Sequence, residues 1–374
     1  MAGRGAGIPF GRLRRGECPT GGLAGSCGMR SWMSKPSTTT ITRINRLVNN
    51  SPPCLVVNLL PSVGVAMIAP MTSRVVNVSS VPHRSPFRYP GGKTWLVPYI
   101  RKWIESLDRR PFEFAEPFAG GATVGLSVLF DELAVKVTLV EMDRNVASVW
   151  KTVLSVQGER LASEILSFQM SEGSVKSCLS NNPRHQFERA FQTILKNRVQ
   201  RGGIMAPGAS LMKQGENGKG LASRWYPETL ARRILAITEN KHRIRFFEGD
   251  GIQFIHQNAG RSDVAFFIDP PYTLAARRLY VHSQIDHEKL FLETSSIRGD
   301  FLMTYDDCKP IRALAARFGF DTHKIPMKNT HHEIMHELLV GRDLGWARKP
   351  LQLGQNPRFE SLQADRHAGR EALY

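Results

Sequence analysis

Short apolar runs alternate with amphipathic segments through the middle of the chain. Runs such as "FEFAEPF" and "VTLVEMD" are typical of buried strands, whereas "NVASVWKTVL" and "KPIRALAARFG" repeat hydrophobic positions at helical spacing. The pattern predicts strands over 112–118, 137–143, 243–250, 264–268, 300–307, 321–329 and 336–343, with helices beginning near 123, 145, 251 and 309. Strands that alternate with helices predict βαβ units and a mostly parallel sheet, an α/β fold.

Polar residues stand where four of these strands should end. They are the turn "EPFAGGAT" at 116–123, Glu141 in "LVEMD", Asp250 in "FEGDG" and Asp269 in "FFIDPPYT". Each has an ordinary explanation, because a glycine turn can serve packing, an acid can begin or cap a helix, and Asp before proline is common in turns. Ligands of parallel sheets bind beyond the carboxyl ends of the strands, so the four together predict a site there.

The charge of the chain favours a polyanionic partner. The formal net charge is +17 with a pI near 10.0, and such a balance is typical of proteins that bind nucleic acid. Residues 1–83 carry +8 of that charge, residues 84–345 carry +7 and residues 346–374 carry +2. The expected folded part is therefore only moderately basic.

The two ends of the chain differ from its middle. Residues 1–83 are rich in Gly, Ser, Thr, Pro and Arg without a sustained period, which predicts a flexible extension, and Met71 is a possible later start. Residues 346–374 read as a polar tail. We expect the catalytic domain to span 84–345.

The cysteines and the apolar stretch after Cys54 indicate in which cellular compartment the protein is expected. The five cysteines form no CxxC pair, which disfavours a zinc site or a disulfide framework and predicts a reducing, cytoplasmic location. The apolar stretch that begins at Cys54 is interrupted by Asn58 and Pro61 and is too short for a membrane span, so no membrane partner is expected.

The glycine turn, Glu141, Asp250 and "DPPY", in this order, resemble the class I S-adenosylmethionine-dependent methyltransferases. Specifically, they resemble the Dam-like DNA adenine-N6 methyltransferases. The motifs "FRYPGGK" at 87–93, "KNRVQRGGI", "SRWYPETLARRI" and "LMTYDDC" extend the resemblance over roughly 84–345. It implies a doubly wound sheet, a helical DNA-recognition insert at about 155–240, S-adenosylmethionine as cofactor and double-stranded DNA as partner.

The same resemblance implies roles for single residues. Catalysis falls to Asp269, Pro270, Pro271 and Tyr272. Cofactor binding falls to Tyr89, Lys93, Glu116, Phe118, Gly120, Glu141, Asp250 and Asp269, and no metal is implied. The residues themselves point to DNA binding mainly by the insert, where Asn197, Arg198 and Arg201 lie in a basic, glycine-flanked run, and Arg88 could read a guanine edge or contact only a phosphate.

Two positions depart from the family pattern, and alternatives remain. Ala122 stands where the family often has the last glycine of its turn, and Tyr89 stands where close relatives carry Trp. N4-cytosine or RNA methylation on the same scaffold is one alternative, although cytosine enzymes of this kind more often have Ser at the position of Asp269. A catalytically idle DNA-binding module is another. The target sequence and a partner restriction endonuclease stay open.

Overall fold

A computed structural model describes residues 76, 81–88, 92–205, 209–213, 215, 218–271, 285–328 and 334–351. All of them belong to one unit, Met67–Tyr374. Most of the extension at 1–83 and of the tail at 346–374 lies outside the described residues, and the limits of the catalytic domain stay a prediction.

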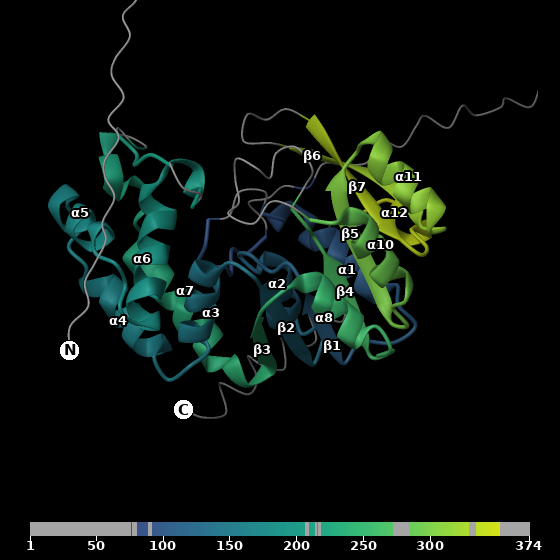
Figure 1. The fold of residues 1–374 in the computed structure, drawn as a ribbon, viewed down its shortest axis with the longest axis horizontal. Coiled ribbons are helices and arrows are strands. Elements are labelled where there is room, and N and C mark those ends of the chain that lie inside the picture. The colour runs from purple at the N-terminus through teal and green to yellow at the C-terminus, as the bar shows by residue number, and fades with distance from the viewer. Residues whose placement is uncertain are drawn as a thin grey trace, which may run out of the picture. The chain divides into compact units, whose positions relative to one another are not determined.

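The described residues form a seven-stranded sheet (Figure 1). Its strands are β1 Glu113–Glu116, β2 Lys136–Glu141, β3 Ile244–Glu248, β4 Val264–Ile268, β5 Asp300–Asp306, β6 Asp321–Lys328 and β7 Ile334–Gly341. Their order is β3-β2-β1-β4-β5-β7-β6. The pairs that β7 makes with β5 and β6 are antiparallel, and the other pairs are parallel. The predicted mostly parallel, doubly wound sheet is confirmed, as are the expected strands and their order along the chain.

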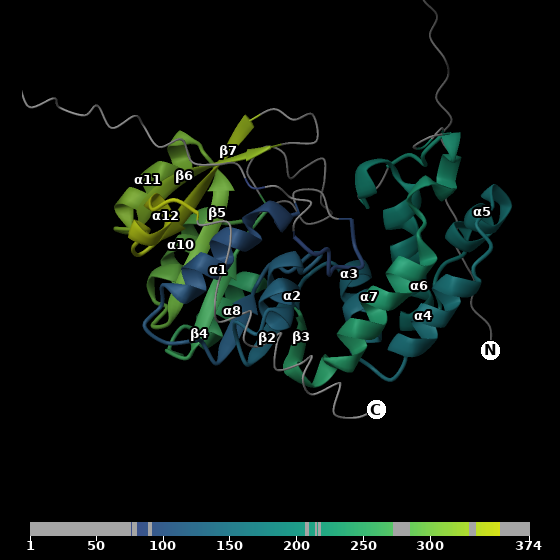
Figure 2. The ribbon, with the colours of Figure 1, turned by 180° about the vertical axis from the view of Figure 1, so that it is seen from behind.

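Helices cover both faces of this sheet (Figure 2). The α-helices are α1 Val97–Glu105, α2 Thr123–Phe130, α3 Arg144–Val153, α4 Gly158–Ser167, α5 Glu172–Ser180, α6 Gln186–Val199, α7 Pro227–Glu239, α8 Gly251–Asn258, α10 His287–Ser295, α11 Lys309–Arg317 and α12 Gly345–Arg348. The short 3-10 turns are η2 Thr94–Leu96, η3 Arg201–Gly203, η5 Gly220–Arg224 and η6 Lys241–Arg243.

Alternate side chains of the central strands fill two separate cores. Phe267 of β4 and Leu302 of β5 pack on the face that α1 and α2 cover, whereas Phe266 and Met303 pack on the face of α8, α10 and α11. All four are fully buried. Because successive strand residues point to opposite faces, a continuous apolar run is what a strand covered on both sides requires.

The segment between β2 and β3 is helical, as the predicted insert requires. Helix α3 packs against α6, and α4 packs against α7, beside the β3 edge of the sheet (Figure 1). The buried faces of these helices carry aliphatic residues at helical spacing, such as Leu161 and Ile165 on α4 and Ile234 and Ile237 on α7. The insert therefore shares its hydrophobic core with α3.

Packed residues extend slightly beyond the domain expected from the sequence. Val76 and Val81 are buried, and Ala347 of α12 is buried where α12 packs against α1. Arg348 also pairs with Asp321 of β6 at 2.6 Å. Apolar residues near both expected limits are thus part of the fold.

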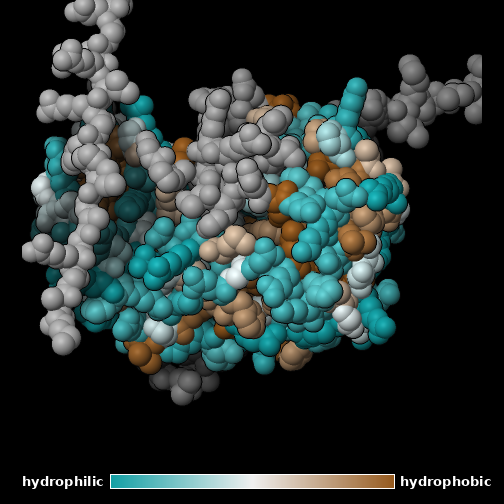
Figure 3. Space-filling model, in the orientation of Figure 1, coloured by the Kyte–Doolittle hydropathy of each residue, from teal (hydrophilic) through white to brown (hydrophobic). Residues whose placement is uncertain are grey.

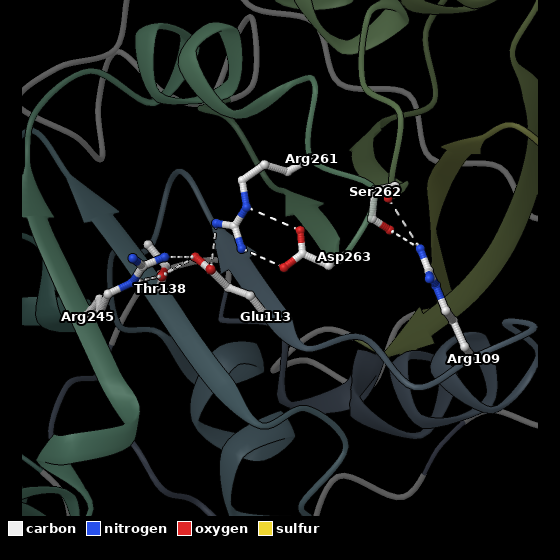
Figure 4. Close-up of polar contacts among 7 residues, drawn as sticks. All are labelled: Arg109, Glu113, Thr138, Arg245, Arg261, Ser262 and Asp263. Carbon is white, nitrogen blue, oxygen red and sulfur yellow. Dashed lines mark hydrogen bonds and ion pairs between the residues drawn. The ribbon is translucent and has the colours of Figure 1, made fainter.

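A network of charged residues ties together the amino ends of the strands (Figure 4). Glu113, the first residue of β1, is buried and accepts bonds from Arg245 at 2.5 Å, from Arg261 at 2.6 Å and from Thr138 at 2.6 Å. Burial alone would raise the pKa of Glu113, but these three donors outweigh it and hold the pKa below its ordinary value. This edge of the sheet is thereby fixed, opposite to the carboxyl ends of the parallel strands.

The face of the molecule shown in Figure 3 is largely hydrophilic, with hydrophobic residues in small groups. Among the residues that the structure describes, no helix is long and apolar enough to cross a membrane.

Candidate active site

Asp269 lies directly after β4, and neighbouring strands hold its carboxylate. The register that pairs Ile268 with Met303 places Asp269 beside Thr304, whose hydroxyl donates to Asp269 Oδ1 at 2.7 Å. Lys93 Nζ lies 3.0 Å from the other oxygen, Oδ2. Both oxygens are therefore engaged and the plane of the carboxylate is fixed, while the side chain keeps 21% of its surface exposed.

Lys93 bridges two carboxylates. Its Nζ also lies 3.1 Å from Glu337 Oε1, and the side chains of Lys93 and Glu337 are each only 6% exposed. Glu337 belongs to β7, opposite Asp306 of β5 in the antiparallel register, which brings it to the edge where β4 ends. Burial opposes the charge on Lys93, but Asp269 and Glu337 outweigh it and hold the pKa of Lys93 above its ordinary value.

Glu116 is the acid at the end of β1, and it is buried. Its Oε2 accepts a 2.7 Å hydrogen bond from the backbone N–H of Gly125 in the first turn of α2. Burial, reinforced by the charge of Asp269, raises the pKa of Glu116 to about 8, although the Gly125 bond and Lys93 act in the opposite direction. The carboxyl group of Glu116 therefore stays protonated up to a higher pH than that of an ordinary glutamate.

The glycine turn is bonded to the tip of β2. Gly120 has φ +46°, and its N–H donates to Glu141 Oε2 at 2.8 Å. The other oxygen of Glu141 accepts from the N–H of Asp143 at 2.7 Å. Burial raises the pKa of Glu141 to about 7 despite these two bonds. Ala122 has φ +49°, a left-handed conformation that glycine adopts at lower cost, so its departure from the family pattern falls on a strained position.

The turn after β3 closes against the glycine turn. Asp250 Oδ1 caps α8 by accepting from Gln253 N–H at 2.8 Å. A Cβ at Gly251 would lie 2.3 Å from the carbonyl oxygen of Pro117 and 3.0 Å from the ring of Phe118. Glycine is therefore required at position 251 for the two turns to approach each other. The helix cap uses one of the two carboxylate oxygens of Asp250.

The four residues predicted to bind DNA have different surroundings. Asn197 is buried and clasps the main chain of Arg88, accepting from its N–H at 2.8 Å and donating to its carbonyl at 2.8 Å. Arg198 is also buried and donates to the carbonyl of Pro86. Arg201 is exposed, whereas Arg88 is half-buried. The side chains of Asn197 and Arg198 thus brace the main chain at Arg88 and Pro86, and their part in DNA binding stays a prediction.

The structure brings Lys93, Glu116 and Asp269 together and joins Gly120 to Glu141, as a shared strand-end site requires. Tyr89 and Tyr272 lie outside the described residues. Thr304 and Glu337 were not predicted. The sequence feature that could have pointed to Glu337 is "HELLVG", where an acid stands directly before an apolar run that is typical of a buried strand.

A sequence profile of the D12 class N6 adenine-specific DNA methyltransferases matches residues 89–330. The chain belongs to this family. The resemblance to Dam-like enzymes is thereby confirmed, and the protein is a methyltransferase. No curated protein was found to match the sequence.

Several solved structures are similar in fold to this methyltransferase. A protein of Pyrococcus horikoshii provisionally assigned as an RNA methyltransferase is 12% identical, with 71% of this chain and 92% of that chain covered and a TM-score of 0.33. A methyltransferase from Geobacter sulfurreducens is 10% identical, with 68% and 80% covered and a TM-score of 0.32. TrmN from Thermus thermophilus is 11% identical, with 67% and 48% covered and a TM-score of 0.31.

Membership of the family implies S-adenosylmethionine as the methyl donor. The strand ends fit such a group, because the chain approaches closely at Gly251, where a side chain would collide with Pro117 and Phe118. Phe118 and Asp250 belong to the two turns that meet here, and Gly120 of the first turn is bonded to Glu141, so two carboxyl groups and an aromatic ring are available to such a group.

Proposed function

We propose that this methyltransferase acts on DNA and transfers a methyl group from S-adenosylmethionine to the N6 amine of a flipped-out adenine at a specific site. The observation that carries the proposal is the carboxylate of Asp269, held by Lys93 and Thr304 at the end of a buried strand yet still partly exposed. Glu141 would accept the ribose hydroxyls, and Lys93, Glu116, Phe118, Gly120 and Asp250 would complete the cofactor site, with Tyr89 beside them.

The chemistry requires position more than acid strength. The exocyclic amine of adenine is a poor nucleophile because its lone pair is delocalised into the ring. Asp269 and the carbonyl of Pro270 would accept hydrogen bonds from that amine and orient its lone pair. S-adenosylmethionine, when bound, supplies an activated methyl group. Pro270 and Pro271 carry no N–H donor, so they fix the corner without competing for the acceptors. Tyr272 would stack on the extruded base.

DNA binding would fall to the exposed side of the insert and to the segment before Lys93. Arg201 is exposed after the end of α6 and is available to a phosphate. The side chain of Arg88 has a buried nitrogen, Nη1, that finds no hydrogen-bond partner among the residues the structure describes, while Asn197 fixes its main chain. An arginine held in this way suits recognition of a base edge or a phosphate.

The test compares Asp269→Asn with Asp108→Asn, a control acid that is exposed in the loop before the amino end of β1. Transfer of tritiated methyl groups to duplex DNA should fall at least about 100-fold in Asp269→Asn, far more than the affinity for DNA, and calorimetry measures S-adenosylmethionine binding by the wild type. Analysis of the modified nucleosides separates N6-methyladenine from N4-methylcytosine. Activity within a few-fold of wild type, modified cytosine, or transfer only to RNA would contradict the proposal, and a wild type that does not bind the cofactor would support the idle module.

A further inference from the structure

A cavity of about 240 Å³ lies between residues 83–84, the last residue of α2 and one face of α7. Four of its lining side chains are basic: His83, Arg84, Arg232 and Arg233. The others are apolar or small: Phe130, Thr229 and Ala236. None of the strand-end residues of the candidate active site lines this cavity, so it is a separate feature of the molecule.

Helix α7 brings two arginines to the cavity through their spacing. The positions that line the cavity lie three or four residues apart and share one face of the helix: Thr229, Arg232, Arg233 and Ala236. Another face carries Ile234 and Ile237, which are buried in the core of the insert. The arginines are therefore not needed to pack α7 and are presented to the cavity instead.

Two of the three arginines are already held in place. Arg233 Nη1 donates to the carbonyl of Ser85 at 3.1 Å. The guanidinium of Arg84 lies over the ring of Phe130, with its Cζ 4.7 Å from the ring centroid, a cation–π arrangement. Because these side chains are ordered before a ligand arrives, binding one costs less conformational entropy.

The basic side chains repel one another. Burial, and then the charge of Arg232, lowers the pKa of Arg233. Burial, and then the charge of Arg233, lowers the pKa of His83 from 6.5, so this imidazole is mainly neutral at pH 7. The positive charge of the cavity at neutral pH therefore belongs to its arginines, and an anion placed among them would relieve their repulsion.

No acid lines the cavity to balance this charge. Asp131, which follows Phe130 directly, pairs with Arg101 at 2.7 Å and not with the arginines of the cavity. Within the part of the chain that the structure describes, no ion pair joins an acid to Arg84, Arg232 or Arg233. The cavity is thus suited to a ligand that brings its own negative charge.

We infer that this cavity binds a phosphate group of the DNA backbone that flanks the target nucleotide. The inference rests on the proposed function. Planar guanidinium groups match the oxygens of a phosphate and can donate to two of them at once. The volume lies below the roughly 300–1,000 Å³ of sites that enclose a whole small molecule, which favours one phosphate with its sugar. Phe130 and Ala236 offer an apolar wall for that sugar.

Basic residues connect the cavity with the segment that leads to Lys93. Arg233 and Arg88 both lie within electrostatic reach of Arg198. Arg88 follows His83 by five positions, so the two residues lie at most about 18 Å apart. About five nucleotides of one DNA strand cover such a length. A duplex that contacts Arg88 can therefore also place a flanking phosphate at the cavity.

The experiment compares Arg232→Gln and Arg232→Glu with Arg298→Gln, a control arginine that is exposed before the amino end of β5. Fluorescence anisotropy measures affinity for duplexes of several sequences at different salt concentrations. For Arg232→Gln we expect affinity at low salt to fall roughly 3- to 10-fold, and equally for all sequences, because a phosphate carries no sequence information. The slope of log affinity against log salt should become shallower by about 0.9, as for one lost phosphate contact. Arg232→Glu should bind more weakly still.

A second variant tests the cavity itself. Ala236→Leu fills part of the cavity, leaves its charge unchanged and keeps a good helix former in α7. If a phosphate enters the cavity, Ala236→Leu should lower DNA affinity and the salt slope as Arg232→Gln does. A general attraction between DNA and surface arginines would leave both unchanged in Ala236→Leu. Affinity for S-adenosylmethionine, measured by calorimetry, should equal that of wild type in every variant.

An unchanged salt slope in Arg232→Gln, or wild-type DNA binding by Ala236→Leu, would overturn the inference. Calorimetry with pyrophosphate tests a free phosphate ester as the other source of the same chemistry. Pyrophosphate binding that Arg232→Gln abolishes, together with an unchanged salt slope, would assign the cavity to such an ester and refute the DNA contact. Methyl transfer tests the proposed function separately. A wild type that binds duplex DNA but methylates no adenine refutes that function, whereas the salt slope still decides the role of the cavity.

Discussion

Glu116 and Gly125 are joined by a hydrogen bond from the backbone N–H of Gly125 to the buried carboxylate, 2.7 Å long. A Cβ at position 125 would lie 2.7 Å from the same carboxylate oxygen and 3.0 Å from a methyl carbon of Leu139. The absence of a side chain therefore lets the first turn of α2 approach the end of β1. This contact sets the distance between the glycine turn and the strand ends.

Gly125→Ala should accordingly destabilise the protein although alanine favours helices. Pushing the helix away from β1 should cost about 1–3 kcal/mol, more than the roughly 1 kcal/mol that helix propensity returns. Urea unfolding measures the difference. Gly260→Ala is the control, because a Cβ there meets nothing within 4 Å. A Gly125→Ala protein as stable as wild type would show that Glu116 and α2 can move apart freely.

Glu116 should also make stability depend on pH. Its pKa is raised from 4.5 to about 8, mainly by burial, so the folded state binds this proton more tightly than the unfolded state. The contribution to stability is full below about pH 4.5 and is lost as the pH rises to about 8. Glu116→Gln removes this group, so its free energy of unfolding should fall less between pH 5 and pH 9 than that of wild type, by more than about 1 kcal/mol. Parallel curves for the two proteins would contradict the raised pKa.

Substitutions of Glu141 test whether its carboxylate binds the cofactor. If its carboxylate holds the ribose, Glu141→Ala should weaken S-adenosylmethionine binding by roughly 1.5–3 kcal/mol. Because the pKa of Glu141 is raised to about 7, wild-type affinity should fall as the pH drops below 7, when the carboxylate becomes protonated and can no longer accept both hydroxyls. In Glu141→Gln this pH dependence should flatten. Calorimetry between pH 5.5 and 8.5 measures both effects, with the exposed Glu159→Gln as control. Equal pH dependence in wild type and Glu141→Gln would show that Glu141 does not carry it.

Central strands such as β4 could be predicted from sequence because they are short apolar runs covered on both faces, as Phe266 and Phe267 illustrate. The rule that ligands of parallel sheets bind beyond the carboxyl ends of the strands singled out Glu116, Glu141, Asp250 and Asp269, and the roles of these residues stay a prediction. Glu337 escaped prediction because its place depends on the antiparallel direction of β7. An apolar run alone does not show in which direction a strand will run.

The basic run "KNRVQR" shows a second limit of the sequence. Arginine and asparagine in such a run usually face solvent, which favoured DNA binding for Asn197 and Arg198. Both side chains are instead turned inward to the segment around Pro86 and Arg88, more than a hundred residues earlier. Burial of a polar side chain against a distant main chain depends on tertiary packing, which local composition does not contain.

Substitution of Glu113 should lower the stability of the protein without changing the cofactor site. Glu113→Gln removes a buried charge from between Arg245 and Arg261 (Figure 4). We expect a loss of roughly 1–3 kcal/mol, less than for a fully buried pair, because both arginines are partly exposed. The loss should be full above the unfolded-state pKa of glutamate and should shrink as the pH falls through the lower folded-state pKa, since a depressed pKa stabilises the ionised folded state. Cofactor affinity at a temperature where both proteins are folded should be unchanged, and a weakened affinity would contradict the separation of the two edges.

Asn197→Ala should lower both the stability of the protein and its methyl-transfer activity, because Asn197 braces the segment that leads to Lys93. Its amide makes three bonds: it accepts from Arg88 N–H, and it donates to the carbonyl of Arg88 and, at 3.0 Å, to that of Gly203. Alanine would leave these buried main-chain groups without partners, at a cost of about 1–3 kcal/mol for each group that water cannot reach. Thermal unfolding should show a clear loss relative to the exposed Asn182→Ala. Methyl transfer to duplex DNA, assayed well below the melting temperature, should also fall, because Arg88 and Lys93 lose their anchor. If Asn197 contacted DNA directly instead, Asn197→Ala would keep its melting temperature and lose only DNA affinity, and that result would refute the bracing role.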